Sequence, residues 1–450
     1  MSTPAAGSTR RRQGGRLSFG LFVVLNVVLL VRPQELYPRL EVLHLYELTM
    51  LACLGLCWPR ILRRLRWGEL MRAPITVCVL VLAPVITMAA LWQSRSGMIE
   101  EYALEYIKIV LYYLVLVAVV DSPQRLKLLC QALGLIIAVI AAVAVLSYHQ
   151  LIQIESLQKL VDVRSDETGG LVRFERLQTV GIFKDPNDLA QILAVGVVLC
   201  VYGWERSRRV VMRLLWPAFM LLMLYGIYRT QSRGGLLALL GGVVVLAIGR
   251  LGLRRAMIAG AVALPVLFLG FSGRQTELTT SDGSAISRVQ LWSDALEAFR
   301  GSPLLGIGPG GMEEQSGQVA HNSFLHAYAE WGMPGGWLFF AAYWAAIWGV
   351  LRLGRRTIQV LDEELAHLTP CLGAVLVAYC VGMLSLTRNY VIPTYLMLGL
   401  ASSYLALVRT NPQKPQIRFG MSLLGRTFAW SMVFLLTMQL FVKVAVRWGG

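Results

Sequence analysis

Charged residues are scarce in this sequence: they make up 15% of its 450 residues, whereas hydrophobic residues make up 56%. A soluble chain of this length carries charge on roughly a quarter of its residues, so the composition excludes an ordinary water-soluble protein. Apolar stretches of about 20 residues, enough to cross roughly 30 Å of hydrocarbon, recur through most of the chain. They lack the alternating pattern of a barrel strand, so the sequence predicts an all-α, polytopic membrane protein.

Spaced metal ligands and disulfide patterns are also missing. The seven cysteines all fall inside apolar runs, where a thiol acts as a small hydrophobic side chain. The long loops contain no Asp-x-Asp, His-x-x-x-His or Cys-x-x-Cys spacing, so we expect no metal ion and no other cofactor. The glycine-rich run at 306–311 follows no strand, which excludes a dinucleotide-binding loop.

Hydropathy predicts about twelve transmembrane spans. They cover 17–32, 41–58, 74–92, 103–120, 128–151, 186–203, 213–228, 234–249, 256–272, 334–351, 369–386 and 393–408. No small-x-small cleavage site follows the first span, so we interpret it as an uncleaved span. A further apolar stretch at 427–446 is either an additional span or, as Lys443 and Arg447 favour, a helix lying in the membrane interface.

Lysine and arginine fall mainly in alternate short loops. These loops contain Arg60, Arg63, Arg64, Arg66 and Arg72; Arg206, Arg208, Arg209 and Arg213; Arg250, Arg254 and Arg255; Arg352, Arg355 and Arg356; and Arg409, Lys414, Arg418 and Arg426. By the positive-inside rule this face is cytoplasmic and the N-terminus lies on it. The net charge of +16 therefore reflects topology and does not indicate a nucleic-acid partner.

The predicted topology divides the chain into four parts. Residues 1–272 form an N-terminal transmembrane bundle of spans 1–9, with a cap on the outer face at about 152–185. Residues 273–333 form a large loop on the same face, and residues 334–408 carry spans 10–12. Residues 409–450 form a cytoplasmic tail with the interfacial or additional helix.

The large outer loop, 273–333, is predicted to contain two short helices. Apolar residues at 286, 289, 292, 296 and 299 form a helical stripe suited to lying on a membrane surface. Gly301-Ser302-Pro303 ends this helix, and the glycines of 306–311 form an extended turn. A second helix, from about 321 to 331, then leads through Pro334 into the tenth span.

Cations on the outer face are the informative exception to this topology. Because translocation disfavours them, their retention suggests an anionic partner near the headgroups, and guanidinium groups suit phosphate oxygens. The glycines after Arg233 would let backbone N–H groups approach a phosphate at a helix start. The alternative is that these side chains reach to lipid headgroups. The cations are Lys184, Arg229, Arg233, Arg288 and Arg388.

Two histidines lie in the large outer loop. His321 opens the second helix with Asn322, and its imidazole titrates near neutrality, so it can act as a base or a donor. The alternative for His321 is a structural cap. His326 points to another face of the helix, which favours packing or contact with solvent.

The order and shared sidedness of five motifs resemble the O-antigen ligase and O-antigen polymerase family of bacterial inner-membrane glycosyltransferases. The motifs are Lys184-Asp185-Pro186-Asn187, Ser232-Arg233-Gly234-Gly235, Ser287-Arg288-x-x-x-Trp292, Gly306-x-Gly308-x-Gly310 and His321-Asn322-x-x-Leu325. The resemblance covers about 180–335 in motifs and the whole chain in topology.

This resemblance implies a metal-independent, inverting transfer of a glycan from undecaprenyl diphosphate, on the periplasmic face of the inner membrane. Arg233 and Arg288 would bind the diphosphate, and His321 would activate the acceptor hydroxyl or stabilise the departing phosphate. Lys184, Arg229 and Arg388 would join the same basic cavity, supported by Asn187, Gly234 and Asn322. The expected acceptor is the lipid A-core, as in the ligases. A lipid-linked repeat, as in the polymerases, and a protein are the alternative acceptors.

A transporter for an anionic lipid-linked glycan is the competing hypothesis. It should place ionisable residues near the membrane midplane and show related halves. No internal repeat is visible, and Glu105 with Lys108 has the spacing of a structural i,i+3 pair. A third hypothesis, a non-catalytic scaffold for envelope assembly, leaves the outer arginines without a role. The sequence therefore favours an enzyme.

Overall fold

The computed structural model describes residues 6–93, 99–154, 157, 161–165, 171–270, 283–355, 357–413 and 417–448. It consists of two compact units. The first comprises residues 1–60, 118–277 and 377–379, and the second comprises residues 61–117, 278–376 and 380–450.

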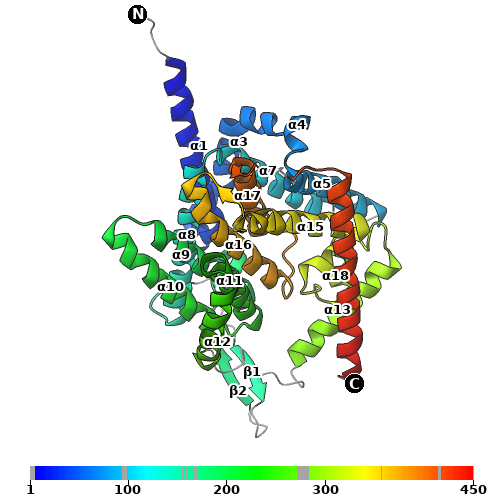
Figure 1. Ribbon diagram of the computed structural model, residues 1–450. Helices are drawn as coiled ribbons and strands as arrows, with labels where there is room; N and C mark the ends of the chain where they lie inside the picture. Colours follow the sequence, from blue (N-terminus) through cyan, green and yellow to red (C-terminus); the bar gives the residue numbers. More distant parts are fainter. Residues whose placement is uncertain are drawn as a thin grey trace, which may run out of the picture. The chain divides into compact units, whose positions relative to one another are not determined.

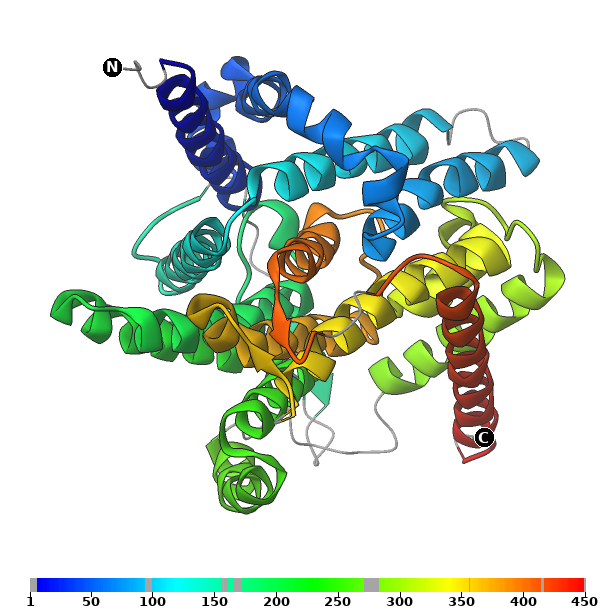
Figure 2. The same cartoon turned by 45° about the horizontal axis from the view of Figure 1, so that its top comes forward.

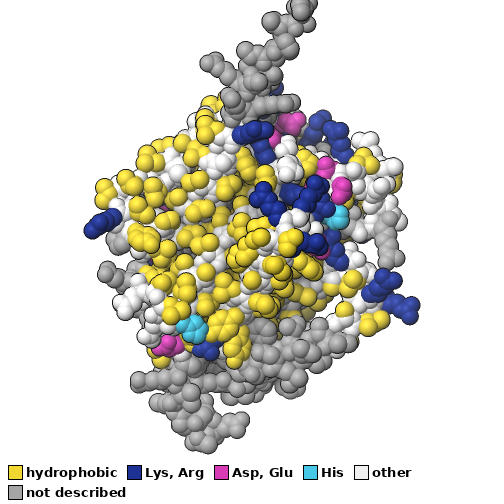
Figure 3. Space-filling view, turned by 90° about the vertical axis from the view of Figure 1, so that its left-hand side faces the viewer, with side chains coloured by type: hydrophobic (Ala, Val, Ile, Leu, Met, Phe, Trp, Pro, Cys, Tyr) yellow, Lys and Arg dark blue, Asp and Glu magenta, His cyan; other side chains and the backbone are white. Residues whose placement is uncertain are grey.

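Among the described residues, ten helices are long and apolar enough to cross a membrane. Two shorter apolar helices, Gly15–Val31 and Ile392–Leu407, match the first and last predicted spans. Apolar side chains cover much of the face drawn in Figure 3, which suits contact with lipid. The prediction of an all-α, polytopic membrane protein is therefore confirmed.

Two details depart from the predicted elements. Met421–Ala445 qualifies by length and composition as a span, which favours the alternative of an additional span over an interfacial helix. Two short antiparallel strand pairs, which the sequence analysis does not predict, lie outside the helices. They are β1 (Val161–Ser165) with β2 (Leu171–Glu175), in the predicted cap, and β3 (Gln359–Val360) with β4 (Thr410–Asn411).

The first unit is built around one buried helix, α9 (Pro186–Arg206), which contacts α8, α10 and α11 (Figure 1). Gly196 and Gly203 face neighbours so closely that a Cβ would lie 2.6 Å from Ile137 and 2.5 Å from Trp216 respectively. Small residues thus let the helices approach, as is common inside membranes. The helices of this unit are α1 (Ala6–Val31), α2 (Pro33–Leu36), most of α3 (Leu45–Arg64), α8 (Pro123–Tyr148), α9, α10 (Val210–Thr230), α11 (Arg233–Leu251) and α12 (Leu253–Gly270).

The second unit is built around α15 (Ser323–Leu351), which contacts α5, α13, α17 and α18. Figure 2 shows α18 in dark red and α13 in yellow-green beside it. The helices of this unit are α4 (Trp67–Leu70), α5 (Pro74–Trp92), α7 (Leu104–Val119), α13 (Gly283–Gly301), α14 (Gly311–Ser316), α15, most of α16 (Glu363–Met383), α17 (Ile392–Leu407) and α18 (Met421–Trp448). On α7, Glu105 and Lys108 form the predicted ion pair, at 2.5 Å.

Helix α13 directs its apolar stripe at protein. It ends at Gly301, as predicted, but Leu296 is buried in a cluster with residues of α15 and α18. The ring of Phe299 meets Tyr328 of α15 at 5.4 Å between centroids, and Trp292 meets Phe441 of α18 at 5.9 Å. From Val289 to Phe299, the stripe expected to lie on a membrane surface is thus covered by two helices. Periodicity shows that a face is apolar, but it does not show what covers that face.

Helix α15 is kinked at Gly332, whose φ of 64° and ψ of −165° are not helical. The N–H of Met333 therefore leaves the helix and donates to the Pro303 carbonyl at 2.8 Å. Pro334 has no N–H to donate. The predicted break between a short helix and the tenth span is confirmed at this residue.

The glycine-rich turn at 306–311 binds the kink. The carbonyls of Ala329 and Glu330, freed by the kink, accept hydrogen bonds from the N–H groups of Ile307 at 2.9 Å and Gly308 at 3.1 Å. A Cβ on Gly306 would lie 2.4 Å from the Glu330 carbonyl, so this position requires glycine. The turn thereby satisfies backbone groups that would otherwise be buried without partners.

Candidate functional site

In the second unit, α15 begins at a polar junction. Asn322 is its N-cap, because Oδ1 accepts hydrogen bonds from the N–H groups of Phe324 at 3.1 Å and Leu325 at 3.2 Å. The helix starts two residues later than predicted, and the cap is Asn322 rather than His321. His321 is half-buried and has a left-handed φ of 48°. That conformation costs a non-glycine residue about 1–2 kcal/mol, and such strain gathers at functional sites.

The segment before α17 is tied to this junction through Ser323. Ser323 Oγ donates to the Leu386 carbonyl at 2.7 Å and accepts from the N–H of Arg388 at 2.9 Å. Asn389 Nδ2 donates to the Ser323 carbonyl at 2.9 Å. Arg388 is only 9% exposed. The residue that anchors it, Ser323, follows His321 by two positions. The structure thus brings the backbone of Arg388 to Ser323, the second residue after His321.

Arg288 lies on α13 in the same unit and is half-buried. The next residue, Val289, packs against the buried cluster that joins α13 to α15 and α18. The helix that carries Arg288 is therefore held by packing against the helix that His321 precedes.

A buried histidine and a buried carboxylate face each other further along α15. His326 Nε2 lies 3.1 Å from Glu330 Oε2, and the two side chains are 4% and 1% exposed. Glu330 Oε1 also accepts from the N–H of Met312 at 3.4 Å. The placement of His326 agrees with packing and excludes contact with solvent. The sequence analysis overlooked Glu330, although a carboxylate within an apolar run was a usable signal.

In the first unit, the short turn between α10 and α11 carries Arg233 as the first residue of α11. Ser232 is the N-cap and accepts from the N–H of Gly235 at 3.1 Å. A Cβ on Gly235 would lie 2.2 Å from that of Ala190, so this glycine lets α11 pack against α9. The Gly235 N–H therefore has a partner within its own turn. Arg233 is half-buried and Gly234 is buried.

Arg176 joins this turn to the start of α9. Its Nε donates to the Thr230 carbonyl at 2.8 Å, and its Nη2 donates to Asn187 Oδ1 at 3.1 Å. The N-cap of α9 is Asp185, which accepts from the N–H of Asn187 at 2.7 Å, so this motif opens the helix as predicted. The sequence analysis missed Arg176, although it is another cation in a predicted outer loop.

Two other predicted phosphate ligands have structural partners. The Arg229 guanidinium lies over the Tyr148 ring, 4.5 Å from its centroid. Lys184 Nζ lies 3.6 Å from Glu35 Oε2, and the lysine side chain is 60% exposed. These contacts give both cations a role in holding the first unit together.

Glu35 has two cationic partners and one backbone hydrogen-bond donor. Arg32 Nη1 donates to Oε1 at 2.9 Å and the N–H of Gly181 donates to Oε2 at 2.9 Å, beside Lys184. Burial raises the pKa of Glu35, but the hydrogen bonds from Arg32 and Gly181 and the charges of Arg32 and Lys184 outweigh burial and lower it. Glu35 is thus a carboxylate that fastens the segment before α9 to the end of α1.

Each unit contains a cavity. The first holds one of about 260 Å³, lined by Tyr148, Glu175 and Arg176 among others, which is smaller than common ligand pockets of about 300–1,000 Å³. The second holds one of about 1210 Å³ whose lining contains none of the predicted site residues.

A family model described as O-antigen ligase matches residues 218–340. No curated protein matches the chain. The matched segment runs from α10 into α15 and contains Arg233, Arg288 and His321. Lys184, Asn187 and Arg388 lie outside it. This match covers part of the chain and, together with the polytopic helical fold, supports an O-antigen ligase family assignment.

Proposed function

We propose that this protein is an O-antigen ligase that transfers a polysaccharide from undecaprenyl diphosphate to the lipid A-core on the periplasmic face of the inner membrane. One observation carries the proposal. The family match over 218–340 contains Arg233, Arg288 and His321, the residues that charge and sidedness select independently.

The proposed reaction is an inverting glycosyl transfer. The acceptor hydroxyl oxygen forms a bond to the anomeric carbon as the bond from that carbon to the diphosphate oxygen breaks. His321 accepts the hydroxyl proton, and undecaprenyl diphosphate leaves with the bonding electron pair. Arg233 and Arg288 bind the diphosphate and neutralise the charge that develops on it. In the alternative role, His321 donates to the departing phosphate.

The junction at the start of α15 supports this assignment. His321 lies outside the helix, with its backbone in a left-handed conformation, so its imidazole is not committed to a helix face. Arg388, anchored through Ser323, places a further guanidinium group on the neighbouring segment. A cation on the segment that joins the start of α15 suits a reaction whose leaving group is a diphosphate.

The proposal is tested in cells lacking the protein, complemented with the His321→Ala variant. We expect polymerised glycan to accumulate on undecaprenyl diphosphate while the lipid A-core stays bare. Removal of a general base lowers a rate by about 10²–10⁴-fold. The measurements are the lipid-linked glycan pool and the lipid A-core profile. The amount of the variant in the inner membrane establishes that it folds.

His367→Ala is the matched control, because this histidine lies on α16 with a 43% exposed side chain. It should restore the wild-type profile. A lipid A-core that carries a single repeat would instead indicate a polymerase. A protein acceptor that stays without glycan would indicate a protein ligase. If His321→Ala restores full transfer, His321 has no catalytic role. Loss of lipid-linked glycan from the outer leaflet would indicate a carrier.

A further inference from the structure

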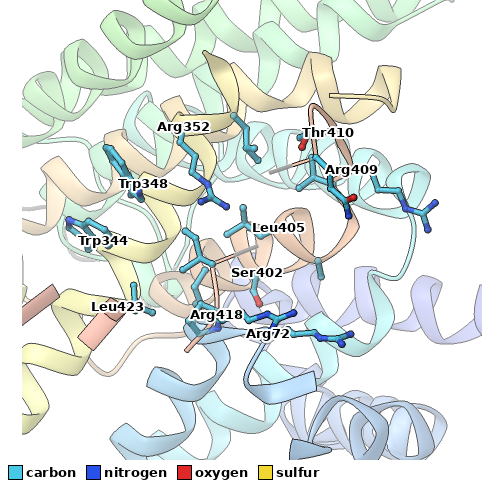
Figure 4. Close-up of a pocket in the computed structure, with 18 of the residues that line it drawn as sticks. Arg72, Trp344, Trp348, Arg352, Ser402, Leu405, Arg409, Thr410, Arg418 and Leu423 are labelled. Atoms are coloured by element: carbon cyan, nitrogen blue, oxygen red, sulfur yellow. The ribbon is translucent and has the colours of Figure 1, made fainter. Parts of the chain in front are cut away.

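The second unit contains a cavity of about 1210 Å³ where the ends of α5, α15, α17 and α18 meet (Figure 4). Five arginines line it, and none of the described lining residues is acidic. Arg352 follows α15, whereas the other four come from segments before α5, after α17 and at the start of α18. The arginines are Arg72, Arg352, Arg409, Arg418 and Arg426.

Backbone contacts bring these separate segments together. The N–H of Phe419 donates to the Met71 carbonyl at 2.8 Å, which joins the neighbours of Arg418 and Arg72. The N–H of Leu361 donates to the Arg409 carbonyl at 3.0 Å, next to the β3–β4 pair. The convergence of the arginines is therefore built into the fold.

The same cavity has apolar walls. Trp344 and Trp348 of α15 stack with ring centroids 5.7 Å apart, and Leu405 and Leu423 line it as well. The buried Ser402 of α17 also lines the cavity, and its Oγ lies 3.3 Å from Oγ1 of Thr76. Tryptophan is enriched where spans meet the headgroup region, so these walls suit the upper part of an acyl chain.

Like charges that converge on one cavity repel one another unless an anion or water separates them. Guanidinium groups bind phosphate oxygens through paired hydrogen bonds. We propose that this cavity binds the phosphate head group of an anionic phospholipid, whose acyl chains leave along the tryptophan wall. Basic pockets between the cytoplasmic ends of spans bind such lipids in other membrane proteins. Five arginines favour a head group with two phosphates over one with a single phosphate.

This site goes beyond the proposed function. Its arginines belong to loops that the positive-inside rule assigns to the cytoplasm, whereas the proposed transfer takes place at the periplasm. The sequence analysis interpreted these arginines as topological signals. Because the five arginines line one cavity, we assign them a ligand as well.

The test uses the full chain in nanodiscs of zwitterionic lipid, into which diphosphatidylglycerol is titrated. We expect the unfolding temperature to rise with the anionic lipid, because a ligand of the folded state stabilises it. In the Arg352→Gln/Arg418→Gln variant, the apparent affinity should fall at least about tenfold, since each charged hydrogen bond contributes about 1.5–3 kcal/mol. Arg208→Gln/Arg209→Gln is the matched control and should retain the wild-type response.

If variant and control lose equal affinity for the anionic lipid, the lipid responds only to general surface charge, and the proposal is overturned. An equal rise with inorganic phosphate in zwitterionic nanodiscs would indicate a soluble anion instead. A photoactivatable diphosphatidylglycerol on the wild-type chain provides a readout independent of variant folding. Labels on peptides containing Trp344, Trp348 or Leu423 support the site, and labels confined to other peptides contradict it.

Discussion

At the residue scale, Glu35 illustrates how one carboxylate orders a predicted outer loop. Its oxygens hold Arg32 of its own segment and the backbone of Gly181, which has a left-handed φ of 80°. Gly181 lies just before the Lys184-Asp185-Pro186-Asn187 motif that opens α9. The position of this motif therefore depends on the carboxylate of Glu35, a role that the residues around Glu35 in the sequence do not indicate.

The Glu35→Gln variant should unfold more easily at neutral pH, by on the order of 1 kcal/mol, because partly exposed ion pairs contribute little more. The pKa of Glu35 is lowered in the folded protein. The contribution of its carboxylate to the stability of the fold is therefore complete above the ordinary carboxyl pKa. It is lost as the pH falls through the lowered value. The difference in unfolding temperature between wild type and variant should therefore shrink on acidification.

Glu41→Gln is the control for this comparison, because it removes the same charge from an exposed side chain six residues away. Its free energy of unfolding should stay within about 0.5 kcal/mol of the wild-type value at every pH. A Glu35→Gln deficit that stays constant down to acidic pH would show that the ion pair is not the source of the effect.

At the scale of elements, the kink of α15 connects the proposed site to the membrane-crossing part of the same helix. The glycine-rich turn and the kink are complementary: the turn donates two N–H groups to the carbonyls that Gly332 and Pro334 release. The motif 306–311 is therefore structural, and it fixes the short helix that follows His321.

Gly332→Ala should disrupt this arrangement. A Cβ there would lie 2.4 Å from the Leu304 carbonyl oxygen, and the φ of 64° is itself unfavourable for alanine. Gly317→Ala is the control, with a φ of 68° and no atom within 4 Å of the added Cβ. Its ψ of −4° is left-handed helical, a conformation that costs alanine less than the ψ of −165° at Gly332.

The control should lose about 1–2 kcal/mol from its backbone conformation alone, whereas the Gly332 variant should lose at least about 1–3 kcal/mol more from overpacking. Thermal unfolding of both variants in detergent measures the difference. Equal losses would mean that the close approach of the 304–306 backbone to the kink is unimportant for stability.

At the scale of the whole molecule, the central expectation is sidedness. All seven cysteines are free, six of them are buried and Cys380 is half-buried, so the natural background for a membrane-impermeant maleimide should be low. Introduced cysteines at exposed positions can therefore report which face of the membrane each loop occupies.

Glu313→Cys, on α14, should react in intact spheroplasts, whereas Arg209→Cys, in a predicted cytoplasmic loop, should react only after permeabilisation. Both side chains are exposed in the structure. The measurement is the fraction of each variant labelled before and after permeabilisation. The reverse pattern would place the large loop in the cytoplasm and remove the basis of the proposed periplasmic transfer.

The amino-acid sequence by itself determined the class of the protein, the positions of nearly all its spans and the motifs that resemble those of O-antigen ligases. These follow from hydropathy, loop charge and local helix signals such as Asp185-Pro186 and Asn322. Such signals act within a few residues, so the start and end of an element can be read from a single segment.

Only the tertiary structure decided which distant residues meet. It anchors Arg388 beside the start of α15, joins Arg176 to Asn187, and turns the apolar stripe of α13 toward α15 and α18. It also gathers five arginines from separate loops around one cavity. Hydropathy and charge do not encode these contacts, because they arise from packing and hydrogen bonds between segments that the sequence keeps apart.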